Sequence, residues 1–495
     1  TSLPYEITSP GHYVLDTDWS GYANPLIKIS SSDVVLDCSG RKLTGTGSGT
    51  CIRVEGVNNV TIHLPEIEKW YYGVYVKDSS NITLMIESNI TICNKGMYLY
   101  NCENCSLSGS SWIKGPGWRG IWLSSSENCN ITELNIANYT EGIIAWGGTN
   151  YRFTDLNFIN CALYFYYINP GNGHSVENCY VNEKPLLYLE DAAFLSITGD
   201  YGEVVLLDCV NITFSGSLAS KNSFLEVLRS ENTTIINSEL TDLKAIYIRY
   251  SKSTSIVGTT IQNSNYVSIV YSNNYTMVDC TLNPTNVDIT SSDYCTLSNV
   301  AFENCGLHLY DSTDNTIVDC TVNGKPLVYL EDASGGSISG DVGQAILVDC
   351  ENVEIDVNVS NTYVGVELHR SRNCDVRANV TNCNYGVWLS RSDNNTINNC
   401  YIESITVYGV YLYYSENNTI VNCYLVSTSS CALYIYYSDF NLVRGCTISD
   451  CNYGISVYYS DYCNVTECSI SCTHRGIWLY HSYNGFIYLN DFLDF

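Results

Sequence analysis

Basic residues and long hydrophobic segments are both scarce in this chain. Only 23 Lys and Arg stand against 51 Asp and Glu, which gives a formal net charge of −28 over 495 residues. A polyanionic surface repels nucleic acid and anionic membranes, so neither is expected as a partner. No run of 18 apolar residues occurs, so no membrane span is predicted.

Proline and helical periodicity are also lacking, which argues against a helical protein. The chain has 9 Pro, and no stretch shows apolar residues at a spacing of 3.6. The sequence YGVYLYYSENNTIVNC (408–423) instead alternates Val410 and Leu412 with Tyr411 and Tyr413. A period of two indicates a strand with one buried face. A turn-like SENN, a second short apolar pair and a Cys-x-apolar segment follow, so three short strands are predicted per repeat.

This motif returns every 21 to 23 residues, for example at 385–400, 431–446 and 453–468. A small residue marks each copy, at Gly365, Gly386, Gly409, Ala432, Gly454 and Gly476. A period of this length means one supersecondary unit per repeat. The sequence therefore predicts an all-β, single-stranded, right-handed parallel β-helix of about 20 coils, with about 22 residues and three short strands in each coil.

A larger repeat is superimposed on the coils. Residues 174–214 match 315–355 without a gap at an offset of 141 residues. We therefore expect an internal duplication of about 161–300 and 305–440 within a β-helix that covers 51–484. Residues 1–50 are predicted to form an irregular capping coil. Residues 485–495 are predicted to form an apolar capping or assembly strand through Phe486, Ile487, Leu489, Phe492, Leu493 and Phe495.

Cysteine is abundant, with 24 residues and no paired CxxC motifs of zinc sites. The cysteines fall in columns one coil apart, including Cys105 with Cys129, and Cys400, Cys423, Cys446 and Cys468. Stacked coils bring Cα atoms to about 4.8 Å, within the range of a disulfide. The alternative is a column of buried free thiols that act as small apolar side chains. We expect disulfides and an extracellular or cell-surface location, and Thr1 in place of Met fits removal of a signal peptide.

Fourteen Asn-x-Ser/Thr sequons are candidate glycosylation sites in turns. They are Asn59, Asn81, Asn89, Asn104, Asn130, Asn138, Asn211, Asn232, Asn274, Asn358, Asn379, Asn394, Asn417 and Asn464. Asn also tolerates turn geometry by itself, so both explanations of these residues stay open.

Outward positions of the first strand of each coil carry an aromatic stripe. Its members include Tyr98, Trp122, Tyr164, Trp388, Tyr411, Tyr413, Tyr434, Tyr436, Tyr458, Trp478 and Tyr480. Aromatic faces bind sugar rings and make large protein contacts, although Tyr is also simply a good strand former. A contiguous stripe favours a binding or assembly surface.

The middle of the same face is polar and contains the candidate catalytic residues. They are Glu331, Asp332, Glu367, His369 and Arg370, with His308 and Asp288 nearby in the pattern. Paired carboxylates can act as acid and base or hold Ca²⁺. The first half of the duplication carries a similar set, Glu190, Asp191, Glu226 and Arg229. Two equivalent sets favour structural pairs or repeated Ca²⁺ sites at Glu190, Asp191, Glu331 and Asp332 over one active site, and no cofactor is required.

The YGIxLxxSxNNTIxNN-type repeats and the block NGKPLVYLED (323–332) resemble β-helix proteins of the NosD type and the pectate-lyase-like superfamily, especially archaeal surface proteins. The resemblance implies a parallel β-helix. It does not fix an activity, because the superfamily includes lyases, hydrolases, epimerases and non-enzymes. The copper binding in the NosD name is not expected here, because 7 scattered His and 3 Met offer no clustered site.

Together these features predict a secreted, glycosylated, disulfide-stabilised structural protein of a cell surface. We expect it to assemble with itself, head to tail or laterally, or to adhere to other surface proteins and glycans. The alternative is a polysaccharide-active lyase or hydrolase, or a glycan-binding protein, that uses the exposed face of the β-helix.

Overall fold

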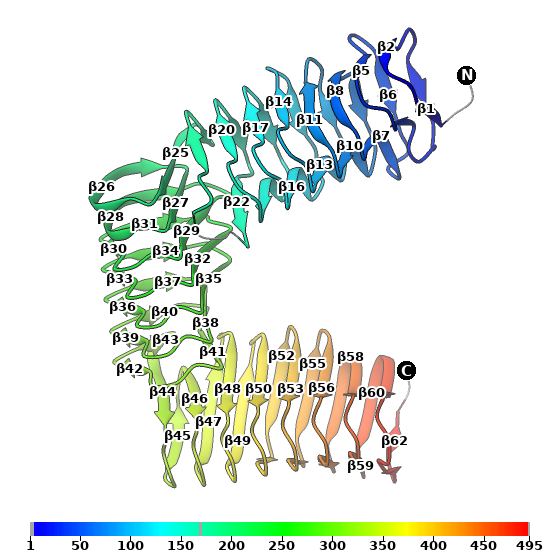
Figure 1. Cartoon of the computed structure of the whole chain (residues 1–495). Coiled ribbons are helices and arrows are strands. Elements are labelled where there is room, and N and C mark those ends of the chain that lie inside the picture. The colour runs from blue at the N-terminus through cyan, green and yellow to red at the C-terminus, as the bar shows by residue number, and fades with distance from the viewer. Residues whose placement is uncertain (1–3, 168–170, 494–495) are drawn as a thin grey trace. The chain divides into compact units, whose positions relative to one another are not determined.

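The computed structural model describes residues 4–167 and 171–493, which form strands and contain no helix. Nearly all strand pairs are parallel and one coil apart in sequence. For example, β10 (Tyr72–Lys77) lies between β7 (Thr50–Glu55) and β13 (Lys95–Tyr100). The predicted parallel β-helix is therefore confirmed, and Figure 1 shows the strands of successive coils side by side. The described residues contain no candidate membrane-spanning helix.

The chain divides into two compact units. Unit 1 comprises residues 1–233 and 238–247, and unit 2 comprises residues 234–237 and 248–495. The division falls within the predicted first duplicated block, 161–300, so the sequence duplication and the compact units do not share boundaries.

Unit 1 begins with three files of parallel strands. The first file is β1 (Tyr5–Ile7), β4 (Ile27–Ile29), β7, β10, β13, β16 (Arg119–Ser124), β19 (Glu141–Trp146) and β22 (Leu163–Tyr166). The second is β2 (Gly11–Val14), β5 (Val34–Asp37), β8 (Asn58–His63), β11 (Ser80–Met85), β14 (Ser106–Ser108), β17 (Asn130–Thr132), β20 (Arg152–Thr154) and β23 (Ser175–Glu177). The third is β3 (Trp19–Ser20), β6 (Lys42–Thr44), β9 (Glu66–Glu68), β12 (Ile90–Thr91), β15 (Trp112–Lys114), β18 (Asn135–Ala137), β21 (Asn157–Ile159) and β24 (Tyr180–Val181).

The first coil already stacks regularly on the second, because β1, β2 and β3 pair in parallel with β4, β5 and β6. The N-terminal residues that the structure describes thus form ordinary coils where an irregular cap was predicted. Unit 1 continues with β25 (Lys184–Glu190), β26 (Ala193–Tyr201), β27 (Glu203–Leu207), β28 (Val210–Ala219), β29 (Phe224–Leu228) and β31 (Glu239–Thr241), and β32 (Ala245–Arg249) spans the division.

Unit 2 starts with shorter strands. They are β30 (Thr234–Ile236), β33 (Ser255–Val257), β34 (Thr260–Gln262), β35 (Tyr266–Val270), β36 (Thr276–Val278), β37 (Thr281–Asn283), β38 (Asn286–Thr290), β39 (Thr296–Ser298), β40 (Ala301–Phe302), β41 (Leu307–Tyr310), β42 (Thr316–Val318) and β43 (Thr321–Val322).

One file of the remaining strands of unit 2 contains β44 (Lys325–Glu331), β46 (Gln344–Val348), β48 (Val364–His369), β50 (Tyr385–Ser390), β53 (Tyr408–Tyr413), β56 (Cys431–Tyr436), β58 (Thr447–Tyr458) and β60 (Ser469–Tyr480). The others are β45 (Ser337–Asp341), β47 (Glu354–Ser360), β49 (Asp375–Thr381), β51 (Thr396–Asn398), β52 (Tyr401–Ile405), β54 (Thr419–Val421), β55 (Tyr424–Thr428), β57 (Leu442–Arg444), β59 (Asn464–Thr466), β61 (Ile487–Tyr488) and β62 (Asp491–Phe492).

The small residue of each repeat sits where successive coils touch. A Cβ atom added at Gly73 would lie 2.5 Å from the carbonyl oxygen of Gly96, and one at Gly96 would lie 2.5 Å from that of Gly120. At these two positions even Ala does not fit without moving the next coil. Around this column the inward Val, Leu and Ile side chains are buried, so the core is a continuous stack along each unit.

Each duplicated block contains a sharp reversal that ends one file of strands. β24 meets β25, and β43 meets β44, in antiparallel pairs. The turn residues Asn182 and Glu183, and Asn323 and Gly324, all have positive φ, as a two-residue hairpin of type I′ requires. β22 in unit 1 and β41 in unit 2, which precede these turns in the chain, are each the last strand of their file.

Candidate functional site

The last strand of a file has backbone N–H groups with no next strand to bond, and buried side chains supply acceptors for them. In unit 1 the N–H of Leu163 donates to Oε2 of Glu203 at 3.2 Å, and the N–H of Phe165 donates to Oε2 of Glu226 at 3.3 Å. Both acids are fully buried. We infer that the two acids lie there to accept these hydrogen bonds, because an unpaired buried N–H is costly.

Unit 2 repeats the arrangement on β41. The N–H of Leu307 donates to Oε1 of Gln344 at 3.1 Å, and the amide nitrogen of Gln344 donates back to the carbonyl of Leu307 at 2.5 Å. The N–H of Leu309 donates to Oε1 of Glu367 at 3.3 Å. Glu367 therefore caps a strand edge as Glu226 does.

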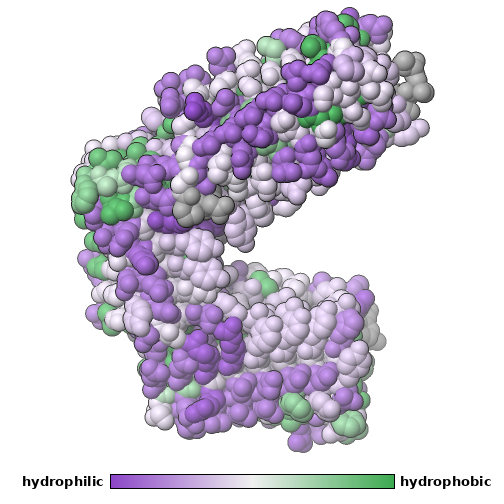
Figure 2. Space-filling model, in the orientation of Figure 1, coloured by the Kyte–Doolittle hydropathy of each residue, from purple (hydrophilic) through white to green (hydrophobic). Residues whose placement is uncertain are grey.

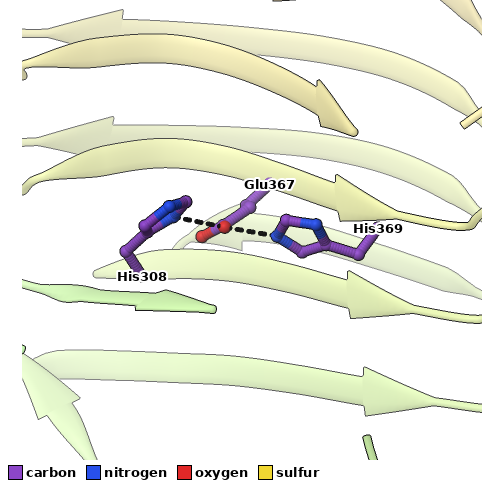
Figure 3. Close-up of side chains that lie close together, drawn as sticks. All are labelled: His308, Glu367 and His369. Carbon is purple, nitrogen blue, oxygen red and sulfur yellow. Dashed lines mark hydrogen bonds and ion pairs between the residues drawn. The ribbon is translucent and has the colours of Figure 1, made fainter. Parts of the chain in front are cut away.

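Two histidines surround the capping carboxylate in unit 2. Nδ1 of His308, on β41, lies 2.6 Å from Oε1 of Glu367, and Nε2 of His369 lies 2.5 Å from the same oxygen. Figure 3 shows both rings turned toward the carboxylate from opposite sides. All three side chains are buried, and their nearest N and O atoms lie within 4.8 Å of one another.

Electrostatics in this cluster favour an ionised carboxylate. Burial alone would raise the pKa of Glu367, but the nearby charges of His308 and His369 outweigh it and lower that pKa to about 2. Burial also acts against a charged His308, yet the Glu367 carboxylate raises the pKa of this imidazole. Burial, with the Glu367 charge as a further contribution, raises the pKa of the nearby Asp288.

The other predicted acidic residues have matched structural roles in both copies. Both oxygens of Glu331 accept backbone hydrogen bonds, from Asp314 N at 2.6 Å and Asn315 N at 2.9 Å, and Tyr329 donates to it at 2.6 Å. Its counterpart Glu190 accepts from two backbone N–H groups and a tyrosine hydroxyl in the same way. Each carboxylate thus fixes a loop to a strand.

The predicted Arg370 is also explained by a matched pair. Its guanidinium contacts Asp349 at 2.8 Å, and Arg229 contacts Asp208 at 2.6 Å in unit 1. Asp332 and its counterpart Asp191 are exposed turn residues with positive φ. Among the residues that the structure describes, the cluster of at least three potential metal ligands is His308, Glu367 and His369, and Ca²⁺ at the predicted carboxylates stays a prediction.

The aromatic stripe that the sequence predicts is present in the structure. Most predicted members are partly exposed and stack on one another along β50, β53, β56, β58 and β60, as with Tyr413 and Tyr436 at 5.9 Å between ring centroids. In Figure 2 the surface of unit 2 carries a broad pale face, as expected for Tyr and Trp. Tyr164 is an exception, because it is only 7% exposed and packs against Phe224 and Tyr247.

A second aromatic file, which sequence reasoning missed, runs beside the stripe. Tyr414, Tyr437 and Tyr459 follow the ends of successive strands with positive φ, and their rings stack 5.1 and 5.0 Å apart. His481 continues the stack at 5.2 Å from Tyr459. The signal was present in the repeated Tyr-Tyr pairs at 413–414, 436–437 and 458–459. We call Tyr414, Tyr437 and Tyr459 the tyrosine file.

The cysteine columns exist, but they are not disulfide ladders. All 24 cysteines are buried free thiols, including the predicted ladder Cys105, Cys129, Cys400, Cys423, Cys446 and Cys468. Neighbours in a parallel ladder stay about 4.8 Å apart at Cβ as well as at Cα, whereas a disulfide needs 3.5–4.5 Å between Cβ atoms. The Sγ atoms donate to backbone carbonyls instead, as Cys423 does to Val421 at 3.4 Å.

The predicted glycosylation sites lie on the surface. Twelve of the 14 sequon asparagines are exposed, and Asn211 and Asn464 are partly exposed. Many of them, such as Asn81 and Asn417, have positive φ, so turn geometry accounts for their recurrence. At the C-terminal end Phe486, Ile487, Leu489, Phe492 and Leu493 are exposed, with β61 and β62 continuing the ladder, and Phe495 lies outside the described residues.

Comparison with known families decides what kind of protein this is. The family described as "Periplasmic copper-binding protein (NosD)" matches residues 13–192 and 335–494, more than half of the chain. The chain belongs to the NosD family. A search of curated proteins finds no match for this NosD-family chain.

Several solved structures are similar to this chain at low sequence identity. The A-module of mannuronan C-5 epimerase AlgE6 from Azotobacter vinelandii is 10% identical, with 90% of this chain and 91% of that chain covered and a TM-score of 0.19. An endo-xylogalacturonan hydrolase from Aspergillus tubingensis is 12% identical, with 63% and 87% covered and a TM-score of 0.26. The alginate lyase AlyF-OU02 is 11% identical, with 66% and 79% covered and a TM-score of 0.24.

One expectation about this NosD-family chain is wrong. The histidines were predicted to be scattered, but His308 and His369 converge on Glu367 although 61 residues separate them in the sequence. The repeat pattern relates each residue to the next coil, and these two histidines meet instead where the file of β41 ends beside β48.

Proposed function

We propose that this NosD-family β-helix works outside the cytoplasm as an adhesive surface element that binds polysaccharide along the aromatic face of unit 2. The observation that carries the proposal is the tyrosine file. Tyr414, Tyr437 and Tyr459 are 46%, 38% and 39% exposed although each is stacked on its neighbour. A continuous exposed row of rings is a common mark of a binding surface.

The geometry of this face suits an extended polymer of sugars. Flat tyrosine faces offer apolar area at small entropic cost, and each hydroxyl group can hydrogen-bond. The rings repeat at the coil spacing, so a chain lying along the file meets the same surface several times, which raises avidity. The net charge of −28 favours a neutral polysaccharide over an acidic one.

The location and modification of the protein belong to the same proposal. The family description names the periplasm, and the exposed sequon asparagines are accessible to glycosylation. Burial raises the pKa of thiols such as Cys305 and Cys161, to about 11 and about 12 respectively. Buried, protonated thiols react slowly, so free cysteines are compatible with an oxidising compartment.

Self-assembly is a second candidate, favoured by the exposed apolar side chains of 486–493. A second copy that stacks on β61 and β62 would extend the ladder, and head-to-tail contacts of this kind build filaments. Deletion of 485–495 should abolish filaments seen by electron microscopy. Wild-type protein that stays monomeric at high concentration would contradict this candidate.

Glycan binding is tested with Y414S/Y437S/Y459S and a panel of neutral and acidic polysaccharides. We expect the variant to bind neutral polymers at least 10-fold more weakly than wild type. The control Y22S/Y180S removes two exposed tyrosines of unit 1 outside the file and should bind as wild type does. If Y414S/Y437S/Y459S binds as tightly as Y22S/Y180S, the proposed surface is refuted. Release of reducing ends by wild type would favour the lyase or hydrolase alternative.

A further inference from the structure

We propose that His308, Glu367 and His369 form a binding site for one divalent transition-metal ion in unit 2. The proposal concerns a different chemistry from that of the aromatic face, and it does not depend on glycan binding.

Comparison of the two duplicated blocks shows which residues of the cluster the strand end requires. Glu367 caps β41 and Glu226 caps β22, with backbone N–H to carboxylate distances of 3.3 Å in both units. A carboxylate at this position is therefore explained by the strand end. The two histidines are not explained in this way. His308 lies between the capped Leu307 and Leu309, and the residue between the capped Leu163 and Phe165 of unit 1 is Tyr164. The residue that matches His369 is Leu228. The strand is capped there without any imidazole.

The donor atoms are arranged as ligands rather than as a satisfied hydrogen-bond network. Two ring nitrogens approach the same oxygen, Oε1 of Glu367, at 2.5 and 2.6 Å. Nδ1 of His308, despite its short distance, has no hydrogen bond of proper geometry, and neither does Oε2 of Glu367 among the residues that the structure describes. Buried polar atoms without partners commonly mark a missing ion or water.

The donor types select the class of ion. Imidazole nitrogen suits Zn²⁺, Cu²⁺ and Ni²⁺, whereas Ca²⁺ and Mg²⁺ prefer sites made of oxygen alone. Two imidazoles and one carboxylate also form the protein ligand set of some zinc enzymes, with a further position left for water. Binding of such an ion would release the imidazole protons that now lie between the two rings and the Glu367 carboxylate.

Neighbouring groups hold the ligands in place. The indole ring of Trp388 stacks on His308 with 4.3 Å between ring centroids. Asp288 pairs with His308 in register on the adjacent strand, and its buried Oδ1 has no hydrogen-bond partner among the described residues. A carboxylate beside a histidine ligand is a frequent second partner in metal sites, since it orients the ring and makes it more basic.

The test uses full-length protein freed of metal by a chelator and titrated separately with Cu²⁺ and Zn²⁺ in equilibrium dialysis. We expect one ion per wild-type chain. H308Y/H369L restores the residues found in unit 1 and should weaken binding at least 100-fold. E367Q should weaken it as well, while its amide oxygen still caps Leu309 as that of Gln344 caps Leu307. The control H474A removes an exposed histidine and should not change affinity.

Two spectroscopic measurements distinguish loss of metal ligands from loss of the fold. Copper-loaded wild type should show electron paramagnetic resonance with hyperfine coupling to two nitrogens, and H308Y/H369L should lose this signature. Circular dichroism must show that each variant retains the wild-type strand content. Wild type that binds no more ion than H308Y/H369L, or a folded E367Q with wild-type affinity, would overturn the proposal and leave the cluster as a structural ion pair.

Discussion

Replacement of Glu203 by Gln tests how the strand end in unit 1 is capped. Burial, and next the charge of Glu226, raise the pKa of Glu203 well above its ordinary value of 4.5. Its counterpart in unit 2 is Gln344, a neutral side chain that both accepts from and donates to Leu307. We therefore infer that the folded carboxyl of Glu203 stays protonated to a higher pH than the unfolded one, while its Oε2 accepts from the backbone as the amide oxygen of Gln344 does.

The sign and size of the effect follow from this proton. Below pH 4.5 the carboxyl is protonated in both folded and unfolded chains, so its contribution to stability is complete. As the pH rises, the unfolded carboxyl ionises and the folded one does not, and wild type loses about 1.4 kcal/mol per pH unit up to the folded pKa. E203Q should recover this loss, which grows by about 1.4 kcal/mol for each pH unit between 4.5 and the folded pKa, because an amide does not titrate.

The measurement is thermal unfolding from pH 4 to pH 8, followed by circular dichroism, with hydrogen exchange at the amides of 163–166 as a local readout. E203Q should match wild type near pH 4 and become progressively more stable than wild type above it. The reverse substitution Q344E should lower stability with the same pH dependence. A stability difference that does not change with pH, or an E203Q protein less stable at pH 7, would show that the reasoning is wrong.

Three further predictions concern the cysteine thiols, the column of small residues and the Glu331 carboxylate. Cys451 and Cys472, whose Sγ atoms lie 2.7 Å apart beside a register irregularity, should be the pair that oxidises, so unreduced, denatured protein should titrate 22 thiols; a count near zero would restore the disulfide ladder. G96A should destabilise unit 1 by about 1–3 kcal/mol because its Cβ meets the carbonyl of Gly120, and an unchanged melting temperature would contradict this packing. E331A should cost about 2 kcal/mol through its lost hydrogen bonds without altering metal affinity, and a large loss of metal binding would place Glu331 in the site.

The fold could be predicted from the sequence because its determinants repeat at short range. The small residue, the period of two and the turn residues all act within one coil or between adjacent coils, so the pattern can be read along the chain. The aromatic stripe was predictable for the same reason. Tyr164 departs from it because β22 is the last strand of its file, where Phe224 and Tyr247 cover the ring.

The histidine cluster could not be predicted because it depends on where a file of strands ends. His308 and His369 lie several coils apart in sequence, and a solenoid pattern gives contacts only between successive coils. The disulfide prediction used a correct spacing between Cα atoms but ignored the direction of the side chains, which in register remain parallel. The tyrosine file was missed because positive φ is uncommon for a bulky residue such as Tyr414.

The column of glycines inside each unit has a consequence for the outside. It leaves room for adjacent coils to approach at the spacing of hydrogen-bonded strands, and every turn residue repeats at that spacing. The backbone repeat therefore fixes where each surface side chain lies, whatever type of side chain occupies that position. Replacing the rings of the tyrosine file by charged or amide side chains should therefore change the binding specificity of this face. The buried core would stay the same.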